Sequence, residues 1–332
     1  MFSSSAFSAF KLAAWKLGRS WIDWPRNCLD FSRILPAKPL FITGAHRCGT
    51  TWVGAMMSDP GCWYLHEPFA PHTGIWPEEF SYCPVGGQCQ EVDRLMDGML
   101  AGRERRALKD KWSESRFAPV RLFPMPGQPR RLLIKDPLAC LLAPYICNKY
   151  DLNTIIIWRH PLGFAESVVR LGWPVGKFIR YLLKHDSLQD AFTDQARKIM
   201  QDLSVEDSLP AAVVLHGALY RVMINELSDA MPLLQVDFEM LCNDPISEFK
   251  KLYEFAGWPY DDGVVQRHRK LTTDHESETA GYHPHRVSRD SKSQAWKWKK
   301  KVASEQASLA SELWSYFDLA RYGNHQQWET ES

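Results

Sequence analysis

Residues 39–51 read Pro39-Leu40-Phe41-Ile42-Thr43-Gly44-Ala45-His46-Arg47-Cys48-Gly49-Thr50-Thr51. The first five residues form an apolar run that suits a buried strand, and the residues after the stretch open a helix-like run. A strand, a glycine-containing turn and a helix in this order form a phosphate-binding turn, because backbone N–H groups and the positive end of the helix dipole meet there. The stretch therefore predicts an anion site at residues 44–51.

This turn departs from the P-loop of nucleotide triphosphatases at one position. Gly44, Gly49 and Thr51 match that pattern, but Thr50 stands where a P-loop has the lysine that reaches the β- and γ-phosphates. Arg47 supplies a cation elsewhere in the turn. We therefore predict a phosphate site that lacks the main charge for Mg²⁺-assisted phosphoryl transfer.

The composition is that of an ordinary globular protein. The 332 residues are 45% hydrophobic and 24% charged, which is enough for one large domain with a substantial core. Forty Lys and Arg against 39 Asp and Glu leave a formal net charge of +1, so we expect no nucleic-acid partner. Without an internal repeat or a low-complexity linker, we predict a single domain over residues 38–332, preceded by an amphipathic helical segment over residues 1–37.

The N-terminal segment combines aromatic and basic residues. Its apolar residues are spaced three and four apart on one helical stripe, which consists of Phe7, Phe10, Ala14, Leu17, Trp21 and Trp24. Two interpretations stay open, peripheral membrane contact through residues 7–24 and packing over the domain's own core. We find neither an 18-residue apolar run nor a secretory leader, so we expect a cytoplasmic protein, with membrane association as the alternative.

The eight cysteines form no C-x-x-C pair and lack the spacing of a zinc site, so no metal is expected. We expect them to be mostly reduced thiols, although Cys83 and Cys89 lie in a loop-like stretch where an oxidising compartment would allow a bridge. Cys48 lies beside Arg47 and a helix N-terminus, which would stabilise its thiolate. A tight turn needs only a small residue there, and we favour that packing role.

The rest of the chain alternates strand-like and helix-like segments. This order predicts an α/β, P-loop-like fold in three layers, with a central, mostly parallel sheet flanked by helices. The expected elements are strands at residues 62–65, 132–134, 154–158 and 233–238, and helices at 91–112, within 175–229, at 245–256 and from about residue 304.

Three of the expected strands end in polar clusters. These clusters are His66-Glu67-Pro68, Lys135-Asp136-Pro137 and Arg159-His160-Pro161. Ligands of open parallel sheets bind just outside the carboxyl ends of the strands. We therefore expect the three clusters and the turn at residues 44–51 to face one crevice.

These motifs, in this order, resemble the sulfotransferases that use 3′-phosphoadenosine 5′-phosphosulfate (PAPS). The run Arg47-Cys48-Gly49-Thr50-Thr51-Trp52 is similar to the family's 5′-phosphosulfate loop, and Arg159 with Ser167 eight residues later is similar to its 3′-phosphate site. His66-Glu67-Pro68-Phe69 resembles a segment of the carbohydrate branch, and Ile134-Lys135-Asp136-Pro137 resembles one of the protein-tyrosine branch. The resemblance runs from about residue 38 to about residue 301.

The resemblance implies PAPS as co-substrate and sulfuryl transfer to an acceptor hydroxyl by in-line displacement without a metal. It implies that residues 47–52 hold the 5′-phosphosulfate and that Arg159 and Ser167 hold the 3′-phosphate. Ser288 and Arg289 resemble part of the segment that closes over the cofactor. Trp52 either stacks on the adenine or packs under the loop, and packing is favoured because aromatic residues are mostly core residues.

Three side chains are the catalytic candidates. Arg47 and Lys135 would neutralise charge on the leaving phosphate and the sulfonate. Glu67 would take the acceptor's proton, with its pKa raised by burial while adjacent cations oppose that shift. An ion pair is the structural alternative for Glu67 and Lys135. His66 is the rival base, and we expect His66 and Glu67 to point to opposite sides.

The acceptor and the reaction class keep alternatives. We favour a glycan or glycolipid hydroxyl as acceptor, with a peptide tyrosine as the alternative. A P-loop nucleotide kinase or phosphotransferase is the alternative reaction class. It would need Mg²⁺ and an aspartate at the end of a buried strand, but the candidate strands end in Lys135 and Arg159. A non-catalytic nucleotide-binding, membrane-associated module would need neither Glu67 nor Lys135.

Overall fold

The computed structural model describes residues 35–58, 62–71, 80–102, 104, 131–272 and 291–330. The expected amphipathic stripe lies outside the described residues, so the N-terminal segment and its boundary at residue 37 stay a prediction. None of the described helices is long and apolar enough to cross a membrane.

Five strands form the central sheet, in the order β2-β3-β1-β4-β5. They are β1 (Leu40–Thr43), β2 (Cys62–His66), β3 (Arg131–Lys135), β4 (Asn153–Trp158) and β5 (Leu233–Asp237). Every pairing is parallel, which confirms the predicted sheet. β1 lies in the centre with all its residues buried, because a strand covered on both faces is a continuous apolar run.

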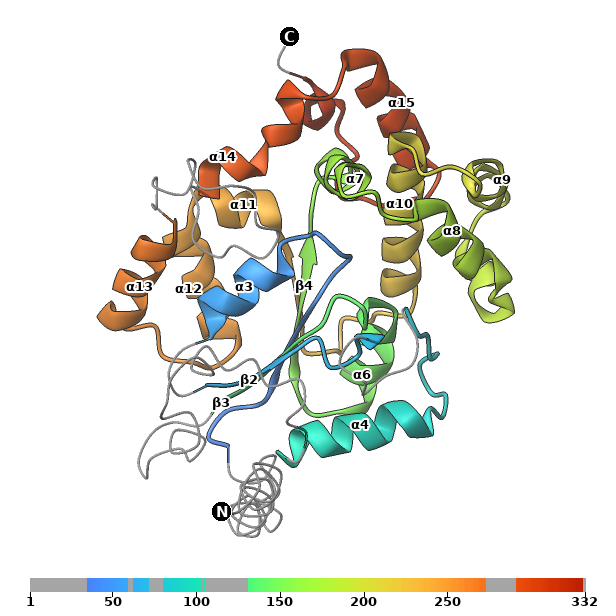
Figure 1. Ribbon diagram of the computed structural model, residues 1–332. Coiled ribbons are helices and arrows are strands. Elements are labelled where there is room, and N and C mark those ends of the chain that lie inside the picture. The colour runs from blue at the N-terminus through green and yellow to red at the C-terminus, as the bar shows by residue number, and fades with distance from the viewer. Residues whose placement is uncertain are drawn as a thin grey trace, which may run out of the picture.

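Helices cover both faces of the sheet and complete the predicted three-layer α/β fold. Figure 1 shows α3 (Thr50–Met57) and α12 (Pro245–Phe255) on one side of the strands, with α6 (Ala143–Lys149) and α10 (Leu209–Asn225) on the other. The other described helices are α4 (Gln90–Leu100), α7 (Pro161–Arg170), α8 (Val175–Lys184), α9 (Asp194–Leu203), α11 (Phe238–Asn243), α13 (Asp262–Thr272), α14 (Ser291–Ala295) and α15 (Ser304–Ser315).

The pairing register brings the polar clusters to one edge of the sheet. Lys135, the last residue of β3, pairs with His66 of β2 on one side and with Ile42 of β1 on the other. Thr43 pairs with Ile156 of β4, so the turn after β1 begins near the end of β4. The three polar clusters and the turn therefore leave the same edge of the sheet, as expected.

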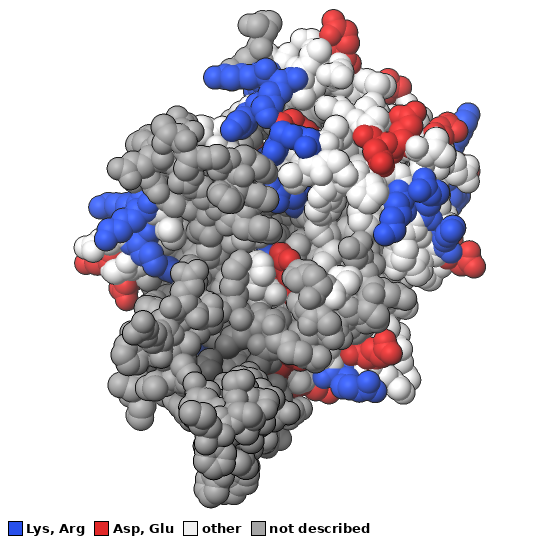
Figure 2. Space-filling model, viewed as in Figure 1, with Lys and Arg blue, Asp and Glu red and all other residues white. Residues whose placement is uncertain are grey.

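Residues 291–330, which we call the C-terminal segment, run across this edge. Figure 1 shows the segment passing from α14 to α15 above α7 and the carboxyl end of β4. Lys and Arg side chains gather near the top of the same view in Figure 2, where the chain runs from α14 to α15 in Figure 1. The short helical turn after α14 reads Lys297-Trp298-Lys299-Lys300. Basic charge therefore borders the end of the sheet where an anion is expected.

Helix α4 is shorter than the sequence suggested. The prediction of a helix over residues 91–112 is confirmed as far as Leu100 and is wrong at residues 101, 102 and 104, because Gly102 adopts a φ of 70°. Residues 103 and 105–112 lie outside the described part of the chain, so the prediction is not tested there. Its N–H donates to the carbonyl of Met99 at 3.0 Å. A glycine in this conformation is a common way to end a helix.

Cys83 and Cys89 form a disulfide, so the expectation of reduced thiols is wrong for this pair. Their Cα atoms lie 6.4 Å apart, within the range that a disulfide requires. Glu226, next to the end of α10, holds the same loop by accepting from the hydroxyl of Tyr82 at 2.7 Å and from the N–H of Val85 at 2.9 Å. The described cysteines outside this pair are free of disulfides, namely Cys48, Cys62, Cys140, Cys147 and Cys242.

Candidate active site

The turn after β1 has a backbone that two glycines make possible. Gly44 has a φ of 143°, and a Cβ atom there would clash with the carbonyl oxygen of Ile157. Gly49 has a φ of 90°, and a Cβ atom there would clash with the ring of Phe238. Only glycine, which has no Cβ atom, readily accepts both a positive φ and such a close approach of neighbouring atoms. Arg47 has a φ of 62° although it is not glycine, and such strain persists where the surroundings hold it, often at functional sites.

Helix α3 begins directly after this turn, with Gly49 as its N-cap. The first N–H groups of a helix have no partner within the helix, and the positive end of its dipole lies beside them. Thr50 is buried at the start of the helix, and the hydroxyl of Thr51 accepts from Nζ of Lys135 at 3.1 Å. The turn has the local structure that the sequence predicts for anion binding.

Arg47 lies beside the predicted 3′-phosphate residues. Its Nε donates to Oγ of Ser167 at 3.2 Å, and its carbonyl accepts from the guanidinium of Arg159 at 2.5 Å. The Arg159 guanidinium lies 5.0 Å from the centre of the Phe238 ring, a cation–π contact. Nε of Arg159 is buried and has no hydrogen-bond partner among the described residues. An anion with several oxygens would suit this pair of arginines.

Lys135 and Glu67 form an ion pair at the ends of β3 and β2. The fully buried Lys135 side chain donates to the Glu67 carboxylate. The N–H of Glu67 donates to the Lys135 carbonyl at 2.7 Å, which brings the residue after β2 over the end of β3. The ion pair that we kept as the structural alternative therefore exists, and it lies at the predicted site.

The carboxyl group of Glu67 is more acidic than expected. Burial raises its pKa, but the charge of Lys135, followed by that of His66, acts in the opposite direction and lowers it to about 2. The expectation of a raised pKa is wrong here because the ammonium group of Lys135 lies directly on the carboxylate. Glu67 is therefore ionised at physiological pH.

Two histidines flank Glu67. Nε2 of His66 lies 3.6 Å from Oε1 of Glu67, so the expectation that these side chains point to opposite sides is wrong. The alternation of the strand ends at His66, because Glu67 leaves β2 with a φ of 54°. His46, in the turn after β1, interacts electrostatically with Glu67, and burial lowers its pKa to about 3. The His46 ring is therefore neutral.

Aromatic side chains hold the ring of His46. Its centroid lies 4.8 Å from the ring of Phe80 and 4.8 Å from the ring of Trp173, both in edge-to-face contact. Phe80 contacts Phe178 with the ring centroids 5.1 Å apart. We call these four residues the aromatic wall. The wall packs around His46, whose ring interacts electrostatically with Glu67.

Asp136 supports the site without belonging to its reactive surface. Burial raises the pKa of its carboxyl group to about 7, a shift that often marks a functional residue. Its two oxygens, however, accept from the backbone N–H groups of Phe69 at 2.6 Å and Leu138 at 2.8 Å, and the residue is fully buried. Asp136 therefore fixes the chain just after Glu67.

Two members of the predicted cofactor loop have side chains in the core. Burial raises the pKa of the Cys48 thiol to about 12, so its thiolate is not stabilised. The ring of Trp52 meets Phe238 and Phe249 edge to face, with centroids 5.9 and 5.2 Å apart. Both observations agree with the packing roles favoured from the sequence.

The predicted tail residues Ser288 and Arg289 lie outside the described residues, so their cofactor contacts stay a prediction. Among the residues that the structure describes, no group of three or more His, Cys, Asp or Glu side chains is arranged to hold a metal ion.

Sequence reasoning missed two residues of α10 that support the site. Nε2 of His216 donates to the carbonyl of Arg159 at 2.9 Å. The hydroxyl of Tyr220 donates to the carbonyl of Ile157 and lies 3.4 Å from the N–H of Ala45 in the phosphate turn. The signal in the sequence is two polar rings four residues apart in an apolar helix, a pattern that ordinary cores also contain.

A model of the sulfotransferase family matches residues 39–262, more than half of the chain. No curated protein matches the chain in sequence. Similar solved structures include the sulfotransferase domain of the olefin synthase of Synechococcus PCC 7002, with 16% identity and a TM-score of 0.45 over 86% of this chain and 96% of that chain. A sulfotransferase of Alicyclobacillus acidocaldarius has 15% identity and a TM-score of 0.41, over 88% of this chain and 99% of that chain. A mouse sulfotransferase complexed with PAP has 15% identity and a TM-score of 0.41, over 83% of this chain and 82% of that chain. Similarity at this level says nothing about substrate or site residues.

Proposed function

The chain belongs to the sulfotransferase family, and on this premise we propose that it transfers the sulfuryl group of PAPS to a hydroxyl group of a glycan or glycolipid. It is a PAPS-dependent enzyme, with PAPS as its co-substrate. One observation carries the assignment of the site: the cations of Arg47, Arg159 and Lys135 and the carboxylate of Glu67 meet at one edge of the sheet.

The described residues suit the 5′-phosphosulfate and the 3′-phosphate of PAPS, the sulfuryl donor. The 5′-phosphosulfate would bind Arg47 and the N–H groups at the start of α3, where an anion gains from the helix dipole. The 3′-phosphate would bind Arg159 and Ser167. The buried Nε of Arg159, which has no partner among the described residues, would gain one there. Adenosine 3′,5′-bisphosphate, called PAP, is the product that remains.

Sulfuryl transfer requires a base and a charge-stabilising group. The acceptor oxygen forms a bond to sulfur, and the bond between sulfur and the bridging oxygen breaks, leaving its electron pair on PAP. The acceptor proton passes to Glu67. Arg47 and Lys135 stabilise the negative charge that grows on the leaving oxygen, the task that Mg²⁺ shares in phosphoryl transfer.

The ion pair between Glu67 and Lys135 sets the strength of the base. While Lys135 lies on the carboxylate, the pKa of Glu67 is about 2, which is too low for efficient proton abstraction. When the ammonium group of Lys135 turns to the sulfonate, the effect of burial remains and the pKa of Glu67 rises. Donor binding would therefore activate the base. His66, 3.6 Å from the carboxylate, is the alternative proton acceptor.

The aromatic wall supports an acceptor with a sugar ring. Sugar rings present C–H faces that pack against aromatic side chains, and His46 brings these rings near Glu67. A neutral imidazole also offers a hydrogen bond to a hydroxyl group without adding charge. A peptide tyrosine is the alternative acceptor and would pack on the same rings.

The compartment and the membrane contact are part of the proposal. The cytoplasm was expected from the sequence, whereas the disulfide between Cys83 and Cys89 favours an oxidising compartment, because cytosolic thiols stay reduced.

Peripheral membrane contact through residues 7–24 is tested by flotation with liposomes before and after removal of residues 1–24. Unchanged flotation would remove that contact from the proposal.

Transfer from labelled PAPS to glycans, glycolipids and tyrosine peptides, measured in EDTA, tests the reaction. Glu67→Gln should lower turnover by roughly two to four orders of magnitude and leave the affinity for PAP almost unchanged. The matched control is Glu312→Gln, which changes a glutamate that pairs with Tyr316 on α15 and should leave turnover unchanged. Turnover that survives in Glu67→Gln but is lost in His66→Asn would move the base to His66. Phosphoryl transfer from ATP that requires Mg²⁺ would support the phosphotransferase alternative instead.

A further inference from the structure

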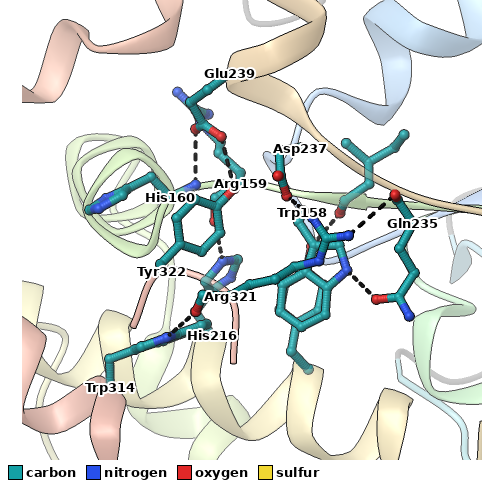
Figure 3. Close-up of polar contacts among 12 residues, drawn as sticks. Trp158, Arg159, His160, His216, Gln235, Asp237, Glu239, Trp314, Arg321 and Tyr322 are labelled. Atoms are coloured by element: carbon teal, nitrogen blue, oxygen red, sulfur yellow. Dashed lines mark hydrogen bonds and ion pairs between the residues drawn. The ribbon is translucent and has the colours of Figure 1, made fainter. Parts of the chain in front are cut away.

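The peptide group that joins Arg159 to His160 is held on both of its edges. Its carbonyl accepts from Nε2 of His216 on α10 at 2.9 Å, and its N–H donates to Oε1 of Glu239 on α11 at 2.9 Å. Figure 3 shows Glu239 and His216 on opposite sides of this strand end. The backbone at Arg159 is therefore fixed by two elements that are far apart in the sequence.

Tyr322, in the C-terminal segment, completes the support of Glu239. Its buried hydroxyl donates to Oε2 of Glu239 at 2.8 Å, and its own carbonyl accepts from Nε1 of Trp328 at 2.8 Å. Tyr322 adopts a φ of 60°, a conformation that costs free energy for a residue other than glycine. Such strain is kept where the surroundings hold it and often marks a functional constraint.

Arg321 and Trp298 also bind the C-terminal segment to the ends of β4 and β5. The guanidinium of Arg321 pairs with Asp237, the last residue of β5, and donates to the carbonyl of Gln235 at 3.3 Å. The ring of His160 stacks on Trp298, with centroids 4.5 Å apart and 13° between the planes. Figure 3 shows Arg321 and Tyr322 reaching β5 and α11 side by side. The segment therefore acts as a brace across the ends of β4 and β5.

We propose that Tyr322 and Glu239 are positioning residues for PAPS. Through the Arg159–His160 peptide, these two residues hold the Arg159 guanidinium where it binds the 3′-phosphate. The inference rests on the proposed function, because it takes the 3′-phosphate of PAPS as the ligand of Arg159. An arginine that binds phosphate through two donors needs a fixed geometry, so a small movement of its backbone weakens the contact. Tyr322 and Glu239 themselves touch no substrate in this account.

Titration calorimetry with PAP and with 5′-AMP separates positioning from general stability, since the two ligands differ only in the 3′-phosphate. In the full chain, Tyr322→Phe should raise the Kd for PAP about five- to tenfold, because one buried hydrogen bond is lost. The Kd for 5′-AMP should stay within about twofold of the wild-type value. Tyr316→Phe removes a hydrogen bond between Tyr316 and Glu312 on an exposed part of the same segment and should change neither Kd.

Substitutions of Glu239 give a second test. Glu239→Ala should reduce the preference for PAP over 5′-AMP as strongly as Tyr322→Phe. Glu239→Gln should keep most of that preference, because its amide oxygen can accept from His160 while its NH₂ group donates to the Tyr322 hydroxyl. If Tyr322→Phe does not fold, Trp328→Phe replaces it, because this change removes the N–H that holds the Tyr322 carbonyl.

Three results would overturn the inference. They are an equal loss of affinity for PAP and 5′-AMP, an unchanged preference in Tyr322→Phe and Glu239→Ala, and a loss in Glu239→Gln as large as that in Glu239→Ala. A wild-type protein without any preference for PAP over 5′-AMP would overturn the proposed PAPS site together with the inference. A wild-type preference that Tyr322→Phe leaves intact would overturn the inference alone.

Discussion

Arg47 and Ser167 lie 120 positions apart in the chain, yet Nε of Arg47 donates to Oγ of Ser167 at 3.2 Å. Arg47 belongs to the turn after β1, and Ser167 belongs to α7 after β4. The contact joins the residues predicted for the 5′-phosphosulfate with those predicted for the 3′-phosphate. The residues predicted for the two subsites are therefore adjacent in the structure.

Ser167→Ala should raise the Kd for PAP about five- to tenfold, because the 3′-phosphate loses a hydroxyl donor and Arg47 loses a partner. Turnover at saturating PAPS should fall less than the affinity. Titration calorimetry and steady-state kinetics measure the two effects. Ser308→Ala is the matched control, since that hydroxyl donates to the Ser304 carbonyl on the exposed face of α15. Unchanged PAP affinity in Ser167→Ala would remove Ser167 from the site.

Gly49→Ala should lower both stability and PAP affinity. The left-handed backbone costs an alanine about 1–2 kcal/mol, and the clash of its Cβ with Phe238 adds about 1–3 kcal/mol. Gly172→Ala is the control, because Gly172 has a φ of 65° but no atom near its Cβ position. Urea unfolding should show the larger loss for Gly49→Ala. Equal losses in the two variants would show that Phe238 does not press on the turn.

Glu239→Gln should gain stability relative to the wild type as the pH rises. Burial raises the pKa of Glu239 to about 7 from its ordinary value of 4.5, so the folded state binds this proton more tightly than the unfolded state. The resulting cost to the wild type grows from about pH 4.5 to about pH 7 and reaches about 3 kcal/mol. Glutamine does not ionise, so the variant does not carry this free-energy cost. Denaturant unfolding at pH 5 and pH 8 measures the difference, and a pH-independent difference would contradict the raised pKa.

The Cys83–Cys89 disulfide should protect both thiols from alkylation until a reductant is added, as read by mass spectrometry of the peptide that contains them. Reduction should lower the stability of the wild type by about 2 kcal/mol, because the bond closes a short loop in the unfolded chain. The variant with Cys83→Ser and Cys89→Ser is the control, and a reductant should not destabilise it further. Alkylation of both thiols in the untreated protein would show that the pair is reduced.

The sheet and the phosphate turn could be predicted from the sequence because their signals are local. A buried strand such as Leu40–Thr43 is a continuous apolar run, and the spacing of Gly44 and Gly49 reflects a backbone that other residues do not fit. The polar clusters at the strand ends followed from the parallel order alone.

The electrostatic state of Glu67 could not be predicted in the same way. Burial and the Lys135 cation act on its pKa in opposite directions, and the outcome depends on the contact between two side chains 68 positions apart. Likewise, His216 and Tyr322 reach the Arg159 strand end from distant segments. A single sequence shows the residue types but not these distances.

Titration calorimetry of the full chain with PAP and with ATP, in EDTA, for the wild type and Arg159→Ala, tests the central claim most directly. The account predicts metal-free binding of PAP to the wild type, a preference for PAP over ATP, and loss of PAP binding in Arg159→Ala. Preference for ATP, or binding that appears only with Mg²⁺, would contradict the account and support a phosphotransferase.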